Sequence, residues 1–331
     1  MIPILSEAQK TQFAEDGYLV IPDFLERSQI DVAIDYCWSR FPVHFIRNKP
    51  STWRGEVEDS CHRLSLSGRG GLVKFQKNEI RPHVPIDQLL PTAKVQRIVQ
   101  QLIGPEAQLD NPLVRGLYPT LPISRFVAVP LRGHIEAHAM EIGTISYLND
   151  VKKGAGAFSL WPGSHIAFYK QFRSKLAFIA APGYNRLVQE FNQRDPIQIE
   201  GKRGDTIFFH HRLFHAPSNN LSRSIRFAYL CDYRTTKYPE HTGAAPQNMW
   251  DDWPEIERLC PTLPSDEKIL ASLTSSKIRR IWVSSPKLRK LFFNIVLNEA
   301  AKKRAGMSRE VRSQKNLGKR RLNRLIVDFD Y

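Results

Sequence analysis

The sequence predicts a mainly β protein, an antiparallel sandwich or barrel with flanking helices and a basic, partly helical C-terminal extension. Three observations lead to this prediction. Short apolar runs separated by turn residues fill residues 113–233, with no helical pattern between most successive runs, which favours antiparallel strands over a doubly wound sheet. Helical patterns occur before this region, near residues 6–16, 28–38 and 90–102, while residues 43–90 have a mixed pattern. Positive charge is concentrated in residues 271–331. We therefore expect two domains, residues 1–270 and 271–331.

The N-terminal part is predicted to begin with a helix, a strand and a second helix. Ser6 opens a capping-box pattern, and Gly17 ends the first helix. The apolar stretch 18–22 follows as a short strand stopped by proline. Apolar residues at helical spacing then predict helices over 28–38 and 90–102.

The β region is predicted to contain a series of short strands. The runs lie at 125–129, 134–138, 143–148, 157–161, 205–210 and 224–230. Residues 166–200 interrupt them with a polar and aromatic insertion, which we interpret as a candidate lid. In the C-terminal extension, Ser285 as N-cap and Gly306 after a basic last turn predict one further helix.

The composition describes a folded globular protein. Of 331 residues, 42% are hydrophobic and 24% are charged, a balance that excludes a disordered chain. The apolar runs fall far short of the ~20 residues that span a bilayer. The four cysteines are scattered without a C-x-x-C pair, which argues against a disulfide framework and for a reducing compartment. Since no leader pattern follows Met1, we expect a cytoplasmic protein.

The net charge of +15 belongs mostly to one segment. Residues 271–331 contain 16 Lys and Arg against four acidic residues, so they carry +12 of it. The predicted helix of this segment has an apolar stripe, which favours docking on the core or on another subunit of a homo-oligomer. Contact with a polyanion is the alternative, because clustered basic side chains attract phosphates.

The pattern His134-Ile135-Glu136 is the first candidate for chemistry. On an extended strand, residues i and i+2 point to the same face, so the imidazole and the carboxylate would converge. With a second histidine from a distant strand they would form a 2-His-1-carboxylate facial triad. Such a triad leaves open positions where non-haem Fe(II) binds oxygen and a co-substrate.

The segment from Gly204 to Arg226 is the second candidate. It reads as a turn, an apolar strand, a histidine at the strand's end, a polar turn, and an arginine inside the next apolar run. An arginine buried without an anion would be costly, so a carboxylate partner is expected for Arg226. The C5 carboxylate of 2-oxoglutarate fits that requirement.

Several motifs, in order, make the chain similar to the phytanoyl-CoA dioxygenase (PhyH-like) family of Fe(II)/2-oxoglutarate-dependent oxygenases. The N-terminal stretch Ser6 to Pro22, Leu102-Ile-Gly-Pro, and Gly156-Ala-Phe with Trp161-Pro-Gly-Ser-His165 resemble its signatures. The distal histidine and arginine of the family correspond to His215 and Arg226. The likeness spans roughly residues 5–235.

The resemblance implies a double-stranded β-helix core, a jelly roll of cupin-like type. It also implies that iron is bound by His134, Glu136 and His215, and that Arg226 holds 2-oxoglutarate. The family usually has Asp where this chain has Glu136, so the reach is longer and the charge is kept.

The activity implied is that of an oxidoreductase, a dioxygenase that hydroxylates or desaturates a small organic substrate with O2, releasing succinate and CO2. The retained carboxylate favours these reactions over halogenation. Thr144, Tyr147 and Ser218 are further candidates for contact with the co-substrate. A catalytically inactive jelly-roll binding protein, whose basic tail recruits an anionic partner, is the alternative.

Other residues compete for these roles. His210 and His211 are alternatives to His215, which we prefer because it ends its strand at the family's distance from Arg226. His165 follows a proline-glycine turn, so a structural role explains it better. His138 continues the face of His134 and is a candidate for substrate contact or for the surface.

Overall fold

The structure is a computed structural model that describes residues 5–60, 71–128, 132–136, 140–169, 171, 183–237 and 248–259. Residues 1–261 form one compact unit. The domain predicted at 271–331, with its tail helix, lies outside the described residues, and so does His138. In the part of the chain that is described, no helix has the length and apolar character needed to cross a membrane.

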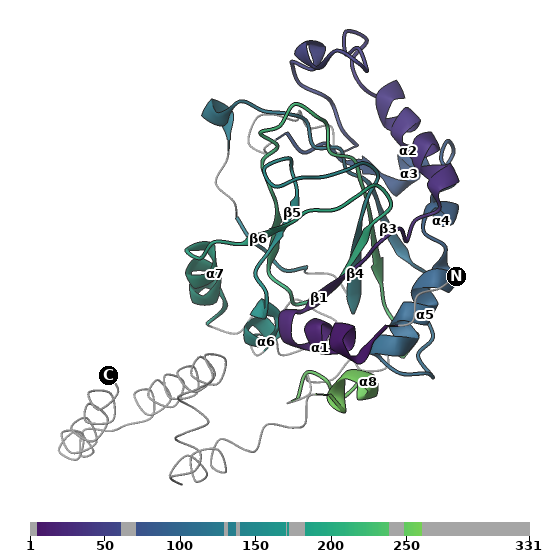
Figure 1. The fold of residues 1–331 in the computed structure, drawn as a ribbon, viewed down its shortest axis with the longest axis vertical. Coiled ribbons are helices and arrows are strands. Elements are labelled where there is room, and N and C mark those ends of the chain that lie inside the picture. The colour runs from purple at the N-terminus through teal and green to yellow at the C-terminus, as the bar shows by residue number, and fades with distance from the viewer. Residues whose placement is uncertain are drawn as a thin grey trace, which may run out of the picture. The chain divides into compact units, whose positions relative to one another are not determined.

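Two antiparallel sheets form the core, which confirms the predicted fold class (Figure 1). The larger sheet has the order β1-β7-β4-β9-β3-β2. Its strands are β1 (Tyr18–Ile21), β2 (Phe75–Gln76), β3 (Leu113–Leu117), β4 (Ile142–Tyr147), β7 (Thr206–His210) and β9 (Ala228–Tyr233). The smaller sheet has the order β6-β5-β8, made by β6 (Ile197–Ile199), β5 (Phe158–Leu160) and β8 (His215–Pro217).

The two sheets pack face to face through apolar side chains. The rings of Phe158 on β5 and Phe209 on β7 lie 5.3 Å apart between their centroids. The buried Tyr147 ties β4 to the smaller sheet, because its hydroxyl donates to the Ile199 carbonyl at 2.8 Å and accepts from the Phe158 N–H at 2.9 Å. Strands paired this way enclose a space between the sheets, the arrangement of a jelly roll.

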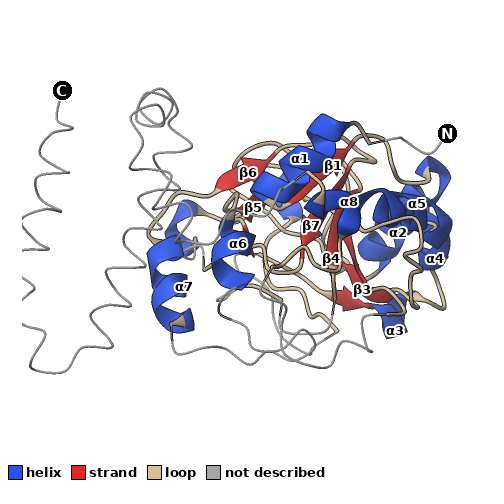
Figure 2. Ribbon diagram, turned by 90° about the horizontal axis from the view of Figure 1, so that it is seen from below, coloured by secondary structure: helices blue, strands red, loops and turns tan. Residues whose placement is uncertain are grey.

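Helices cover both outer sides, as Figures 1 and 2 show together. Near the larger sheet lie α1 (Glu7–Asp16), α2 (Arg27–Ser39), the 3-10 turn η1 (Pro50–Thr52), α3 (Lys77–Ile80), α4 (Ile86–Leu89), α5 (Thr92–Leu102) and α8 (Pro254–Glu257). Beside the smaller sheet lie α6 (Ser164–Tyr169) and α7 (Tyr184–Asn192). Buried apolar faces of α2 and α5 join one continuous cluster with the larger sheet, which is where most of the hydrophobic burial occurs.

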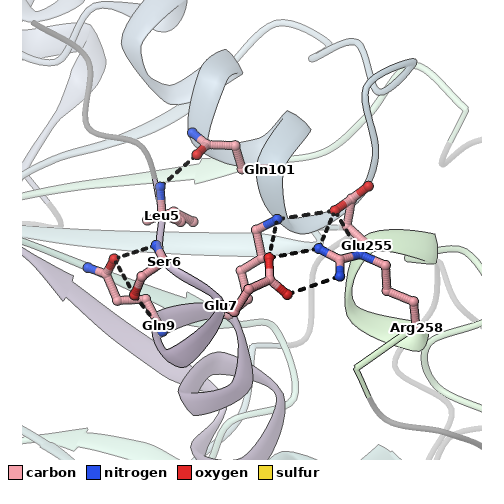
Figure 3. A network of polar contacts seen from close by, with 8 residues as sticks. Leu5, Ser6, Glu7, Gln9, Gln101, Glu255 and Arg258 are labelled. Atoms are coloured by element: carbon pink, nitrogen blue, oxygen red, sulfur yellow. Dashed lines mark hydrogen bonds and ion pairs between the residues drawn. The ribbon is translucent and has the colours of Figure 1, made fainter.

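The first helix is capped and anchored as its sequence predicts. The Ser6 hydroxyl accepts from the Gln9 N–H, and Gly17 ends α1 in the left-handed region at φ 81°. Figure 3 shows a network that joins this helix to α8. The ammonium of Lys10, which is 8% exposed, lies 3.1 Å from a carboxylate oxygen of Glu255, and Arg258 donates to both oxygens of Glu7.

Three predicted β segments are different in the structure. Of the run at 134–138, residues 134–136 are described, and they form an isolated bridge at His134 instead of a strand. Residues Arg125–Val127 form a 3-10 turn, η2, whose N-terminus is capped by the side chain of Ser124. The side chain of Phe126 is 99% exposed, so this run buries no apolar face as a strand of the core would. The strand predicted at 224–230 begins only at Ala228. The predicted helices at 28–38 and 90–102 are both present, as α2 and α5.

Candidate metal centre

The backbone brings His134 and His215 together. They form an isolated antiparallel bridge. The His134 N–H donates to the His215 carbonyl at 2.8 Å, and the His215 N–H donates to the His134 carbonyl at 2.9 Å. Their ring centroids are 4.4 Å apart. Gly133 makes this approach possible, because a Cβ there would lie 2.1 Å from the ring of Phe214.

Glu136 completes a group of three ligand atoms that lie within 4.8 Å of one another. Its Oε1 is 3.5 Å from His215 Nε2 and 3.9 Å from His134 Nε2. With metal–ligand bonds of about 2.1 Å, ligand atoms at right angles lie about 3.0 Å apart, so the separations between ligand atoms would have to shorten by about 0.5 to 2 Å to seat an ion. Two imidazoles and one carboxylate are the donor set of non-haem iron, and these residues fit that metal.

Both imidazoles are held in a state suited to metal binding. His215 Nδ1 lies 2.9 Å from the Leu213 carbonyl oxygen, which can only accept, so Nδ1 is the donor and Nε2 is the nitrogen that faces Glu136. Burial and the neighbouring His215 lower the pKa of His134 to about 3, although Glu136 opposes them. A neutral imidazole is the form that binds a metal ion.

Arg115 and Asp232 extend the centre beyond the triad. Arg115 Nη1 lies 3.2 Å from Glu136 Oε2 and 3.0 Å from Asp232 Oδ2. Burial by itself would lower the pKa of Arg115, but the two carboxylates outweigh it and raise the pKa. Burial would raise the pKa of Glu136, yet contact with His215 and the charge of Arg115 hold it well below the usual range. Glu136 is therefore a carboxylate at neutral pH.

The triad opens into a cavity of about 100 Å³ between the two sheets. The cavity is lined by Leu72, Lys74, Arg115, Tyr118, His134, Glu136, Thr144, Ile145, Phe158, Phe209, His215, Pro217, Arg226, Leu230 and Asp232. Apolar and aromatic walls with a few charged groups are typical of a small-molecule site.

Arg226 lies in the same cavity and is 3% exposed. Its Nε donates to the Gly156 carbonyl at 2.9 Å and its Nη1 to the Tyr118 carbonyl at 3.3 Å. Burial lowers its pKa to about 10, so it remains a cation at neutral pH. Since no carboxylate of the described residues pairs with it, an anionic ligand in the cavity would offset the cost of its burial.

The other predicted residues divide into two groups. Thr144 lines the cavity, and its hydroxyl donates to the Cys231 carbonyl at 2.8 Å. Ser218 does not line it, because its hydroxyl is hydrogen-bonded to that of Ser159. The hydroxyl of Tyr147 is likewise already hydrogen-bonded, to the backbone of Ile199 and Phe158 in the smaller sheet.

The competing histidines lie outside the group of three ligand atoms. His210 Nδ1 accepts from the Arg212 N–H at 3.1 Å, and His211 Nδ1 is hydrogen-bonded to the Met140 carbonyl. His165, at the start of α6, is fully buried with Nε2 3.1 Å from the Ala14 carbonyl oxygen. The structural interpretation of His165 is therefore the one that its contacts favour.

The insertion at 166–200 packs behind the triad in its described part. Ile135 points to the face opposite His134 and Glu136, into a cluster with Phe168 of α6 and Phe191 of α7. None of the described residues of the insertion lines the cavity, and the last of them form β6 in the smaller sheet. The described part thus packs against Ile135, between the two ligands His134 and Glu136.

Comparison with known proteins agrees with this geometry. Residues 133–228 match the family model of phytanoyl-CoA dioxygenase (PhyH), a segment that includes the triad and Arg226. No curated protein matches the chain.

Among solved structures, the chain is similar to EvdMO1, at 17% identity and a TM-score of 0.45, over 69% of this chain and half (50%) of that one. It is also similar to AviO1 from Streptomyces viridochromogenes Tue57, at 17% identity and a TM-score of 0.45, over 68% of this chain and 93% of that one. A third similar structure is EvdO2 from Micromonospora carbonacea var. aurantiaca, complexed with 2-oxoglutarate. It shares 13% identity with this chain at a TM-score of 0.48, over 71% of this chain and 93% of that one. Similarity at this level identifies none of this chain's ligands.

The family match and the donor set together define the class of protein, a non-haem iron(II)- and 2-oxoglutarate-dependent oxidoreductase. Within that class, residues 133–228 resemble the phytanoyl-CoA dioxygenase (PhyH) family.

Sequence reasoning missed Arg115 and Asp232, although a signal for them exists. Each is a charged residue inside an otherwise apolar strand, β3 and β9 respectively. The same observation singled out Arg226. Applied to both strands, it would have pointed to an ion pair between neighbouring strands.

Proposed function

We propose that this protein is a dioxygenase that hydroxylates or desaturates a small organic substrate, with O2 and 2-oxoglutarate as co-substrates and succinate and CO2 as products. In hydroxylation, one oxygen atom of O2 ends in succinate and the other in the product. The observation that carries the proposal is the meeting of His134, Glu136 and His215 in the cavity that also holds Arg226.

Each side chain has a task that follows from its surroundings. The two imidazoles and Glu136 hold iron(II), which supplies the one-electron and oxygen chemistry. Arg226 binds the C5 carboxylate of 2-oxoglutarate and orients its other end toward the triad. Thr144, on the wall of the same cavity, is a further contact for the co-substrate. Ser218 would reach it only after giving up its bond to Ser159.

The walls of the cavity favour an organic substrate. Ile145, Phe158, Phe209 and Leu230 contribute apolar surface beside the triad. Apolar walls exclude water, which protects reactive species from side reactions. The carboxylate at position 136 occupies the place that halogenation would need free, so it supports hydroxylation or desaturation.

The proposed location is the cytoplasm. Cys37 and Cys231, the described cysteines, are both free and buried. Free thiols are typical of proteins from reducing compartments. A homo-oligomer contact or a polyanion contact through residues 271–331 remains a proposal based on charge and on the apolar stripe of the predicted helix.

The test is succinate formation by the full chain with added Fe(II), O2 and 2-oxoglutarate. We expect slow succinate release without substrate, stimulated by the correct member of a panel of small organic compounds. Arg226→Met should need far more 2-oxoglutarate, while Arg223→Met, in the adjacent turn, should behave as the wild type. If the wild type binds no iron and forms no succinate, the chain is instead a binding protein on the same fold.

A further inference from the structure

We propose that Arg115, fixed by Asp232, is a positioning residue that makes Glu136 bind iron through one oxygen atom only. This inference rests on the proposed function, because it concerns the same metal centre. It goes beyond that function by assigning a task to two residues outside the segment that matches the family model, residues 133–228.

The contacts divide the two oxygens of Glu136 between two partners. Oε1 faces the histidines, at 3.5 Å from His215 and 3.9 Å from His134. Oε2 lies 3.2 Å from Arg115 Nη1. The same nitrogen, Nη1, lies 3.0 Å from Asp232 Oδ2, so two carboxylates hold one end of the planar guanidinium in place.

The backbone is built to deliver Arg115 to this place. The pairing of β3 with β9 shifts register between Val114 and Gly116, so Arg115 is the extra residue of a β-bulge. Bulges re-aim side chains, often beside active sites. Val114 and Leu117, three residues apart, therefore both enter the hydrophobic core, while Arg115 faces the cavity.

Gly116 makes the bulge possible. Its φ of +135° lies in the region that favours glycine, and a Cβ there would sit 2.0 Å from the Phe75 carbonyl oxygen. Only glycine therefore fits between Arg115 and the neighbouring strand β2. The bulge at Arg115 and the glycine that follows it act together, and both are needed to aim the Arg115 side chain at the cavity.

The length of Glu136 explains why such a device is useful. A glutamate has one more rotatable bond than an aspartate, so its carboxylate can turn and present both oxygens to the same ion. Chelation by both would occupy a position that 2-oxoglutarate or O2 needs. By holding Oε2, Arg115 leaves Oε1 as the single ligand atom and keeps the remaining positions open.

The experiment uses Co(II) as a spectroscopic probe in the full chain. Co(II) absorption reports the coordination of the ion, and titration of the Co(II)-loaded protein with 2-oxoglutarate gives its dissociation constant. Arg115→Met removes a positive charge beside the ion, so Co(II) binding should persist. We expect its visible spectrum to change and the affinity for 2-oxoglutarate to fall about 10- to 100-fold.

Three variants separate positioning from general stability. Arg115→Lys keeps one donor to Oε2, so it should restore the wild-type spectrum and come within a few-fold of its affinity. Asp232→Asn loosens Arg115 and should give an intermediate loss. Arg234→Met is the matched control, because it breaks a comparable pair with Asp110, at 2.8 Å, away from the triad. It should leave both readouts unchanged.

The outcomes distinguish the two proposals. A wild type that binds no Co(II) overturns the proposed function itself. A wild type that binds Co(II), with Arg115→Met showing the same spectrum and the same affinity for 2-oxoglutarate, overturns only the role of Arg115. Because Asp232→Asn keeps the size of the side chain and the charge of Arg115, it provides the same test should Arg115→Met fail to fold.

Discussion

Among the described residues, His134 with His215 and His165 with His210 are two pairs of histidines with neighbouring rings, and of these two only the first belongs to the candidate metal centre. His134 and His215 have ring centroids 4.4 Å apart, and His165 and His210 are 5.3 Å apart. The first pair shares Glu136 and opens into a cavity. The second pair is fully or almost fully buried and packs against Trp250, at 5.8 Å from His165 and 5.4 Å from His210.

The comparison shows that proximity of imidazoles does not define a site. In the first pair a carboxylate supplies the charge that a cation needs, and the open side leaves room for ligands. In the second pair aromatic rings fill the space, and burial is the main cause that lowers the pKa of both imidazoles. The first pair therefore contributes to chemistry and the second to packing.

Replacing Glu136, the carboxylate beside His134 and His215, should show the largest difference in function between the two histidine pairs. Glu136→Gln keeps the shape of the side chain but removes its charge, so iron binding and succinate formation should fall below detection. His165→Gln should leave both intact and lower the midpoint of urea unfolding instead. Equal iron binding by Glu136→Gln and the wild type would show that the carboxylate is not a ligand.

Arg226→Met should act on the co-substrate and spare the metal. A hydrogen-bonded charge pair contributes about 1.5–3 kcal/mol, which corresponds to about a 10- to 100-fold rise in KM for 2-oxoglutarate. Co(II) affinity should remain unchanged, because Arg226 does not contact the triad atoms. An unchanged KM, measured by succinate release, would remove Arg226 from the binding site.

Acid should destabilise the protein through the buried pair. Burial lowers the pKa of His165 to about 4 in the folded state, against about 6.5 in the unfolded chain. Between these values the unfolded chain binds a proton that the folded one does not, so stability falls as the pH decreases from about 6.5 to 4. The expected loss is about 1.4 kcal/mol per pH unit for this residue.

Urea unfolding at pH 7, 6 and 5 measures this loss. The free energy of unfolding should depend less steeply on pH in His165→Gln than in the wild type. Identical slopes would mean that His165 titrates normally in the folded protein. The lowered pKa of His210 acts in the same direction and should remain in the variant.

Two glycines provide the smallest and most closely matched contrast. Gly17 and Gly154 have similar φ values, +81° and +78°, but a Cβ on Gly17 would lie 2.6 Å from His165 Nδ1, while Gly154 has nothing within 4 Å. Gly154→Ala should cost about 1 kcal/mol and Gly17→Ala about 1–3 kcal/mol more. Thermal unfolding would reveal the difference, and equal losses would mean that the His165 ring moves aside freely.

Much of this fold could be predicted because its signals are local. The capping box at Ser6 and the turn at Gly17 are encoded within a few residues, and α1 forms as predicted. The strands β4 and β7 lie close to their apolar runs. The strand predicted at 125–129 was wrong, because a run of apolar residues does not reveal whether a partner strand is available to bury them.

The site was predictable only in part, since its members come from distant segments. His134 and Glu136 share a face by strand geometry alone, and Arg226 was recognisable as a charge within an apolar run. The choice of His215 over His210 depended on a resemblance. Arg115 was recognisable in the same way, but the direction of its side chain was not, because that direction depends on a β-bulge that forms only when β3 and β9 pair.

Anaerobic titration of the full chain with Fe(II), in the presence of 2-oxoglutarate, shows whether His134, Glu136 and His215 hold one ion together. We expect one equivalent of iron per chain, lost in His215→Ala and in Glu136→Gln but kept in His210→Ala. Iron binding that survives both triad substitutions, or that disappears with His210, would contradict this expectation.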